Sequence, residues 1–140
     1  VRAVRDYLNS RKYRLHLVAK IERAEALDNL EEILDAAGSV LVARGDLGVE
    51  IGLEHVPAAQ KRVLKLAAAL GRESITSTQI LESMRANPVP TRAEVSDIYN
   101  AVLDGTGWLL FTGETARGKY PVEVVRTAAE VAKEAEKTLL

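Results

Sequence analysis

The side chains of this chain that are best suited to chemistry stand at the ends of short apolar runs. They comprise one lysine, one arginine, three carboxylates, three threonine hydroxyls and one amide, with a glycine among them: Lys20, Glu22, Arg44, Gly45, Asp46, Thr76, Thr78, Gln79, Thr112 and Glu114. Two carboxylates from neighbouring loops, such as Glu22 and Asp46, offer the hard oxygen ligands that Mg²⁺ and Mn²⁺ prefer. A lysine beside such a cation suits a phosphorylated or enolate substrate, because both kinds of negative charge need neutralising. Glycines at positions 45 and 48 allow backbone N–H groups to approach an anion.

Each of these features also has an ordinary structural interpretation. A Lys-x-Glu pair on a strand is most often solvated or salt-bridged, and a lone Gly-Asp pair is more often a turn than a metal site. Thr76 and Thr78 suit a strand simply because they are β-branched. His16 is expected to pack in the core, and His55 to lie at the surface. The chemical interpretation therefore depends on the coincidence of several polar strand ends at one rim.

The elements that must position these residues alternate between strand and helix. Short apolar runs predict strands over 14–21, 39–43, 74–77 and 107–112. Helical spacing and end signals predict helices over 1–12, 24–37, 57–70, 92–103 and 121–139, with one or two helical turns over 79–85. Thr91 and Glu94 form the pattern of a capping box, whereas the segment ARGDLG is expected to be a polar loop. Because no hairpin signal appears, the order predicts a parallel sheet, whose strand ends form the rim where ligands bind.

Composition excludes several classes of protein. The chain has 140 residues, of which 47% are hydrophobic and 28% charged, so we expect a single globular domain over residues 1–140. Its net charge of −1 gives no electrostatic footprint for nucleic acid or for an anionic membrane. The absence of cysteine removes disulfides and thiolate metal sites. No apolar run reaches the roughly 18 residues of a membrane span, and no signal-peptide pattern appears. A chain that starts at Val1 is expected to be trimmed, processed or cut from something longer.

Five motifs, in this order, resemble the second half of the (β/α)₈ barrel of the pyruvate kinase family. They are LHLVAKIERAEAL (15–27), VARGDLGVEI (42–51), TQILESM (78–84), NPVPTRAEVSDIYNAVLDG (87–105) and GETARGKYPVEVV (113–125). The resemblance covers nearly the whole chain, and the combination of KIE, ARGDLG and GETA is highly specific. It implies an α/β fold, a half (β/α)₈ TIM barrel with four parallel strands alternating with helices. It also implies a cytoplasmic glycolytic phosphotransferase that converts phosphoenolpyruvate and ADP into pyruvate and ATP.

The resemblance also implies roles for individual residues. Lys20 matches the lysine that contacts the transferring phosphoryl group and stabilises the enolate, and Glu22 and Asp46 match the carboxylate ligands of Mg²⁺ or Mn²⁺. Arg44, Gly45 and Asp46 match a short helix start whose N–H groups hold the substrate carboxylate.

Two further positions match the chemistry of the family's proton transfer. Thr78 corresponds to the threonine beside the substrate, near the site of enolate protonation, and Glu114 corresponds to a glutamate in the proton-relay region.

The chain departs from the family pattern in three respects. Everything before the family's fifth barrel strand is missing, including a phosphate-binding arginine, the K⁺ ligands and much of the nucleotide site. The starts of three strands are altered, at 38–39, 72–74 and 107–108, and Thr112 replaces a serine. Since the altered strand starts lie on the stability face of a barrel, this pattern indicates repacking and suggests an engineered half-barrel.

Three hypotheses follow from the sequence. In the first, the chain is a folded half-barrel without full kinase activity. In the second, it is an enzyme fragment that is active only with its other half. In the third, it is a non-enzymatic scaffold that retains the rim motifs from its ancestor without using them. Four parallel strands leave two open edges and a bare inner face, which invite pairing. We therefore expect either a homodimer that closes an eight-stranded barrel or a rearrangement into a doubly wound open sheet.

Overall fold

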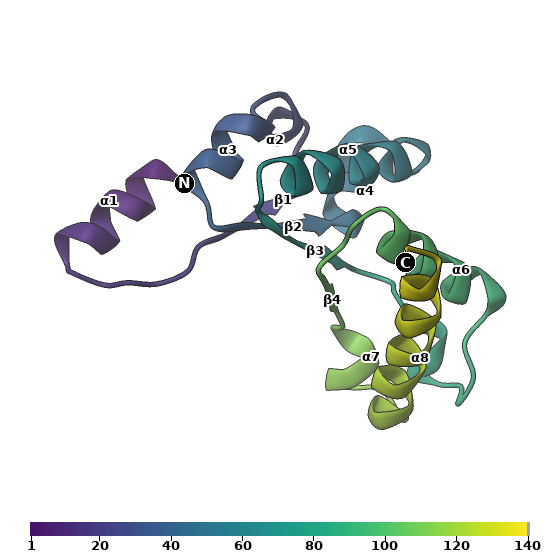
Figure 1. The fold of residues 1–140 in the computed structure, drawn as a ribbon. Coiled ribbons are helices and arrows are strands. Elements are labelled where there is room, and N and C mark those ends of the chain that lie inside the picture. The colour runs from purple at the N-terminus through teal and green to yellow at the C-terminus, as the bar shows by residue number, and fades with distance from the viewer. Residues whose placement is uncertain (140) are drawn as a thin grey trace.

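The computed structural model describes residues 1–139, and its helices and strands alternate along the chain (Figure 1). The elements are α1 (Arg2–Ser10), β1 (Val18–Ile21), α2 (Ala24–Asp28), α3 (Leu30–Ala36), β2 (Ser39–Ala43), α4 (Arg44–Ile51), η1 (Leu53–His55), α5 (Val56–Ala69), β3 (Glu73–Ser77), η2 (Glu82–Arg85), α6 (Arg92–Leu103), β4 (Trp108–Leu110), α7 (Gly113–Ala116) and α8 (Pro121–Leu139). Within these residues the strands form one four-stranded sheet in the order β1-β2-β3-β4. Every neighbouring pair is parallel, which confirms the predicted α/β fold and agrees with a partial TIM barrel.

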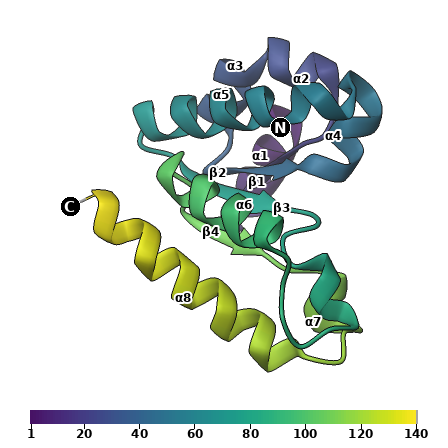
Figure 2. The ribbon, with the colours of Figure 1, turned by 90° about the vertical axis from the view of Figure 1, so that its right-hand side faces the viewer.

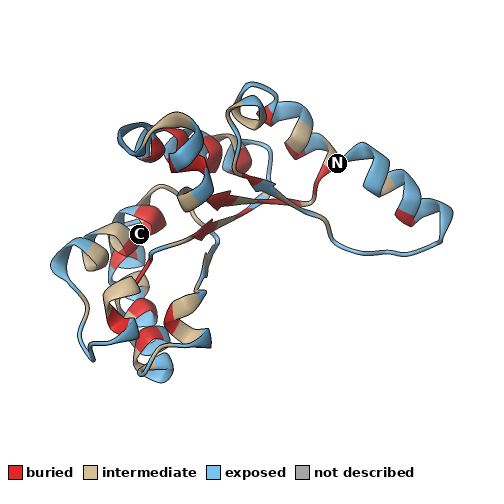
Figure 3. Ribbon diagram, turned by 180° about the vertical axis from the view of Figure 1, so that it is seen from behind, coloured by how far each residue is buried: buried red, intermediate tan, exposed pale blue. Residues whose placement is uncertain are grey.

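One face of the sheet is covered by helices and carries the main core. Val40 and Val42 of β2 are fully buried, as are Leu34 of α3 and Leu64 of α5. Figure 3 shows this burial concentrated where the helices meet the sheet. A second apolar cluster joins the segment after β3 to α6 and α8, which pack against each other (Figure 2). Because strand residues alternate between faces, burial of Val40 and Val42 on the helical side turns Leu41 to the other side.

The opposite face of the sheet is largely open. The register aligns Lys20, Leu41, Ile75 and Trp108 in one row across the four strands, so their side chains share that face. Trp108 is 60% exposed. In a barrel completed by a second copy, this row would face the interior. The shielding that a second copy would give Trp108 stays a prediction.

Most predicted elements are confirmed, with differences in extent at several places. The predicted helix over 24–37 is divided at Asn29 into α2 and α3. Both outer strands are shorter than predicted: β1 begins at Val18, and β4 covers Trp108–Leu110 only. The capping box is confirmed, since the Thr91 side chain accepts from the Glu94 N–H while the Glu94 carboxylate accepts from the Thr91 N–H at 2.8 Å.

Two sequence predictions are wrong. The segment ARGDLG was expected to be a loop, but Arg44 begins helix α4 directly after β2, because Leu47 is fully buried and anchors the turn. His16 was expected in the core, yet its side chain is 56% exposed, because the chain before Val18 runs extended and away from the helical layer (Figure 1). Its ring instead forms a hydrogen bond with Ser39 Oγ at 2.6 Å.

No helix within residues 1–139 combines the length and apolar character needed to cross a membrane.

Candidate functional site

Lys20, Glu22 and Asp46 come together at the C-terminal ends of β1 and β2. The Lys20 ammonium lies between the two carboxylates, in contact with Glu22 Oε2 and 3.0 Å from Asp46 Oδ2. Parallel pairing places Lys20 beside Leu41, which brings the end of β1 level with the residues that lead into α4. All three side chains are solvent-accessible, with Lys20 53% and Asp46 64% exposed. The structure thus places the predicted lysine and both predicted metal ligands within one cluster, here called the rim cluster.

The charges of the rim cluster reinforce one another. Hydrogen bonds to Glu22 and then to Asp46 raise the pKa of Lys20 above its ordinary value. The hydrogen bond from Lys20 lowers the pKa of Asp46 below its ordinary value. Both shifts favour the charged forms of Lys20 and Asp46, so the hydrogen bond between them is an ion pair at neutral pH.

The donor set of the rim cluster fits a weakly held divalent cation. Two carboxylates already converge on one positive charge, and Mg²⁺ is commonly bound by one or two carboxylates together with waters and substrate oxygens. In the described part of the chain, no group of three or more His, Cys, Asp or Glu side chains is placed to hold a metal. Glu22 and Asp46 thus provide part of a coordination shell.

A candidate anion-binding surface begins beside the rim cluster. The first N–H groups of α4, including those of Gly45 and Asp46, have no acceptor within the helix, and the helix dipole favours negative charge there. Thr78 lies against this helix start: a Cβ added to Gly45 would stand 2.9 Å from Thr78 Cγ2. Glycine at position 45 therefore permits close contact between α4 and the turn after β3.

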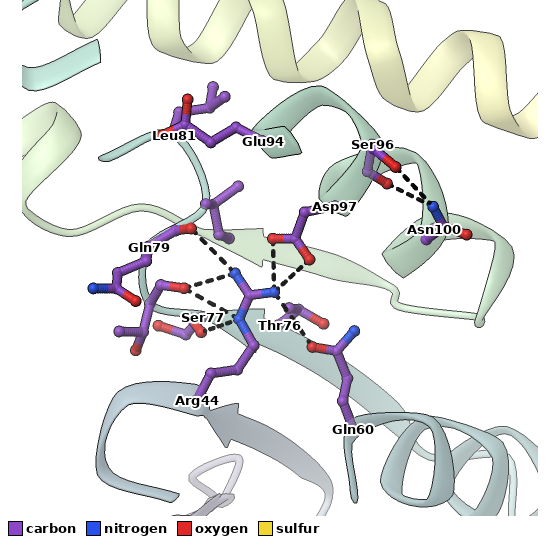
Figure 4. Close-up of polar contacts among 12 residues, drawn as sticks. Arg44, Gln60, Thr76, Ser77, Gln79, Leu81, Glu94, Ser96, Asp97 and Asn100 are labelled. Carbon is purple, nitrogen blue, oxygen red and sulfur yellow. Dashed lines mark hydrogen bonds and ion pairs between the residues drawn. The ribbon is translucent and has the colours of Figure 1, made fainter. Parts of the chain in front are cut away.

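The Arg44 side chain turns away from this surface and into the protein. Its guanidinium is bonded to backbone carbonyls after β3 and to Asp97 of α6, and only 12% of the side chain is exposed (Figure 4). The predicted substrate-binding role of Arg44 can therefore involve its backbone N–H, while its side chain is committed to the fold. A cavity of about 430 Å³ between α5 and α6 adjoins this guanidinium.

Glu114 is fully buried and accepts hydrogen bonds on both oxygens. Oε1 accepts from the N–H groups of Ile80 at 3.2 Å and Leu81 at 3.4 Å, and Oε2 accepts from Thr112 N–H at 2.8 Å and Oγ1 at 3.2 Å. Burial raises the pKa of Glu114, but the backbone hydrogen bonds outweigh burial and leave this pKa below its ordinary value. No hydrogen bond joins Glu114 to the rim cluster or to Thr78 among residues 1–139, and its proton-relay role stays a prediction.

Sequence reasoning missed Asp97 and Gln60, which complete the surroundings of Arg44. Gln60 is buried on α5, and its Oε1 lies 3.5 Å from Arg44 Nη1. A signal for Asp97 was present, since it stands four residues before Ala101 and hence on the inward side of α6. A charged residue on that side of a helix requires a buried partner.

Comparison with known proteins agrees with this fold. Residues 1–125 match the family model described as pyruvate kinase, barrel domain. The chain is 54% identical to pyruvate kinase of Thermotoga maritima over 123 residues, which is 88% of the chain and 26% of that protein. It is 51% identical to pyruvate kinase of Geobacillus stearothermophilus over 125 residues, covering 89% of the chain and 21% of that protein.

A more distant relative gives the same result. Pyruvate kinase of Methanocaldococcus jannaschii is 47% identical over 136 residues, covering 97% of the chain and 30% of that protein. The chain belongs to the pyruvate kinase family and corresponds to part of its barrel domain. It spans less than a third of the length of the relatives described here.

Proposed function

We propose that this chain carries the metal- and carboxylate-binding part of a pyruvate kinase site and lacks full kinase activity when alone. The observation that carries the proposal is the rim cluster, in which Lys20 contacts Glu22 and Asp46 beside the free N–H groups of α4. Membership of the family supports phosphoenolpyruvate or pyruvate as the ligand and ADP as the second substrate of the complete enzyme. It also supports a cytoplasmic location.

Each residue has a defined task in this proposal. Glu22 and Asp46 would hold Mg²⁺ or Mn²⁺, which supplies positive charge for the substrate oxygens when bound. The N–H groups of Gly45 and Asp46 would bind the substrate carboxylate, as helix starts bind anions. Lys20 would stabilise the negative charge that develops on the enolate oxygen. Thr78, in contact with Gly45, would lie beside the carbon that gains or loses a proton.

Full phosphoryl transfer needs more than these groups. In the resemblance, the phosphate-binding arginine, the K⁺ ligands and the nucleotide contacts precede the fifth barrel strand and are not represented in this sequence. The removal of one preorganised stabilising group commonly lowers a rate by about 10²–10³. We therefore expect ATP formation by the chain alone to be undetectable. Exchange of a pyruvate methyl proton with solvent requires only the groups of the rim.

The test is deuterium uptake into pyruvate in ²H₂O, followed by NMR with and without Mg²⁺. We expect metal-dependent exchange that is lost in Lys20→Met, because that variant keeps the side-chain length and removes the charge. Glu54→Gln, on the exposed segment η1, is the matched control and should exchange like the parent chain. No exchange in the parent chain, or equal exchange in Lys20→Met, would refute the proposal. Sustained ATP synthesis that vanishes in Lys20→Met would restore a complete kinase.

A second candidate function is self-assembly, supported by the exposed apolar side chains of the open face. Trp108 and Leu110 are 60% and 38% exposed, and β1 and β4 each have an unpaired edge within the described sheet. Two copies related by a twofold axis would place β4 of each beside β1 of the other, which closes an eight-stranded barrel. Sedimentation should then give twice the chain mass, and Trp108 fluorescence should redden on dilution. A monomer with unchanged fluorescence at all concentrations would exclude this assembly.

A further inference from the structure

We infer that Asp97 is a positioning residue, which fixes through Arg44 the backbone turn that presents Thr78 to the rim. The inference rests on the proposed function, because Thr78 matters only if a substrate binds beside it. It assigns a task to a carboxylate on α6 that is bonded to Arg44 and not to the rim cluster. The connection runs from α6 to Arg44, then to the turn after β3 and finally to the start of α4.

Arg44 holds the turn through three consecutive carbonyl groups. Its Nε donates to the carbonyl oxygens of Ser77 and Thr78, both at 3.1 Å, and its Nη2 donates to Thr78 O at 2.7 Å and to Gln79 O at 3.4 Å (Figure 4). These carbonyls stand where β3 ends. One rigid, planar donor group therefore defines the path of the chain as it leaves the strand.

The turn needs such support because its backbone is strained. Thr78 has φ +76° and Gln79 has φ +53°, and both lie in the left-handed region that favours glycine. A β-branched residue such as Thr78 is a genuine outlier there. Strained residues of this kind persist only where the surrounding structure over-determines them. The hydrogen bonds from Arg44 to the carbonyl groups of this turn hold the strained backbone in place.

Asp97 in turn fixes the Arg44 guanidinium. Both carboxylate oxygens of Asp97 accept from Arg44 Nη1 at 2.7 Å, while Gln60 provides only a long contact at 3.5 Å. Arg44 is mostly buried, so its charge requires a partner inside the protein. The nearby Lys61 and Asp104 are already paired with each other at 2.5 Å. Asp97 is thus the carboxylate committed to Arg44.

The consequence of the connection is the location of the Thr78 side chain. Its methyl group packs on Gly45, at the helix start that we propose binds the substrate carboxylate. If the turn relaxes to negative φ, Thr78 must move relative to the N–H groups of α4. A misplacement of about 1 Å can lower a rate about 10²-fold.

The test compares Asp97→Asn with Asp104→Asn in the 140-residue chain. Both substitutions neutralise a carboxylate on the same cavity, but only Asp97 contacts Arg44. In Asp97→Asn we expect Thr78 and Gln79 to lose the ¹³Cα and ¹³Cβ shifts of a left-handed backbone, together with the nuclear Overhauser contact from Thr78 to Gly45. Deuterium uptake into pyruvate should fall about 10- to 100-fold, with Mn²⁺ affinity unchanged. Asp104→Asn should keep the shifts and the uptake.

A rescue variant separates positioning from general damage to the fold. Gln79→Gly, added to Asp97→Asn, relieves strain at one of the two left-handed residues and should restore part of the lost uptake. Unchanged Thr78 and Gln79 shifts in Asp97→Asn would overturn the inference, as would altered shifts with full uptake. If the parent chain takes up no deuterium, the proposed function fails, and the shifts still decide whether Asp97 fixes the turn.

Discussion

Carboxylates occur in two contrasting settings at the rim end of this molecule. Glu22 and Asp46 are exposed and share one lysine ammonium, whereas Glu114 is fully buried and accepts from three backbone N–H groups and a hydroxyl. An exposed ion pair is worth little and is exchanged readily for another cation. Removal of a buried carboxylate leaves the backbone N–H groups that it accepted from without a hydrogen-bond partner. Glu22 and Asp46 are therefore available to bind a ligand, whereas Glu114 stabilises the backbone around it.

The largest effect should come from removal of the buried carboxylate. Glu114→Ala leaves the N–H groups of Ile80, Leu81 and Thr112 without their acceptor and should lower the free energy of unfolding by about 3–5 kcal/mol. Urea denaturation measures this loss. Asp46→Asn, at the exposed cluster, should change the urea midpoint little. Equal losses in the two variants would remove the distinction between the two settings.

The two faces of the sheet should differ in a similar way. Leu64→Ala, on the helix-covered face, should cost about 3 kcal/mol, because the side chain is fully buried. Leu110→Ala, on the open face, should cost below about 1 kcal/mol in a monomer. A large cost at Leu110 that depends on protein concentration would instead show that a second copy covers this face.

Acid should lower the stability of the fold through two hydrogen-bonded carboxylates, the buried Glu114 and the partly buried Glu94. The folded pKa of Glu114 lies below its ordinary value, so its contribution to stability is complete above the unfolded pKa of about 4.3 and is lost as pH falls through the folded pKa. Glu94 has a lowered pKa as well: burial raises it, but hydrogen bonds from Ser83 and Thr91 outweigh burial. Urea midpoints measured between neutral pH and pH about 3 should fall less steeply in Glu114→Gln than in the parent chain. Parallel curves would contradict this assignment.

The smallest effect concerns competition within the rim cluster. Because the Lys20 ammonium stands between Glu22 and Asp46, a divalent cation must displace it from both. Lys20→Met should therefore raise Mn²⁺ affinity about twofold to fivefold, the size expected for exposed pairs. Isothermal titration with Mn²⁺ provides the comparison, and lower affinity in Lys20→Met would show that the lysine supports the metal.

Much of the fold could be predicted from local pattern. The apolar run 39–43 and the capping box at Thr91 and Glu94 each contain their own signal, and β2 and α6 follow the predicted bounds. The rim cluster was predictable too, because parallel strands bring their C-terminal ends together. The prediction that His16 is buried was wrong. Its apolar neighbours in the sequence favoured burial, but nothing within residues 1–139 covers this part of the chain, and the side chain is 56% exposed.

The contacts of Arg44 could not be predicted in the same way. Its partners lie 16 to 53 residues away in the sequence. The left-handed backbone at position 78 has no sequence signal either, because the residue there is threonine and not glycine. Sequence similarity identified Arg44 with a binding segment but could not tell its backbone from its side chain. Only the three-dimensional arrangement shows a guanidinium that supports a turn.

The most direct test of this account is a Mn²⁺ titration of the chain followed by paramagnetic broadening in NMR. We predict that the amide signals of Glu22, Gly45 and Asp46 broaden first, while those of Ile80 and Leu81 beside Glu114 persist. Glu22→Gln and Asp46→Asn should each abolish the early broadening, and Glu114→Gln should leave it intact. Early broadening that is centred on Glu114, or that survives both rim substitutions, would contradict the assignment of the exposed carboxylates to the metal.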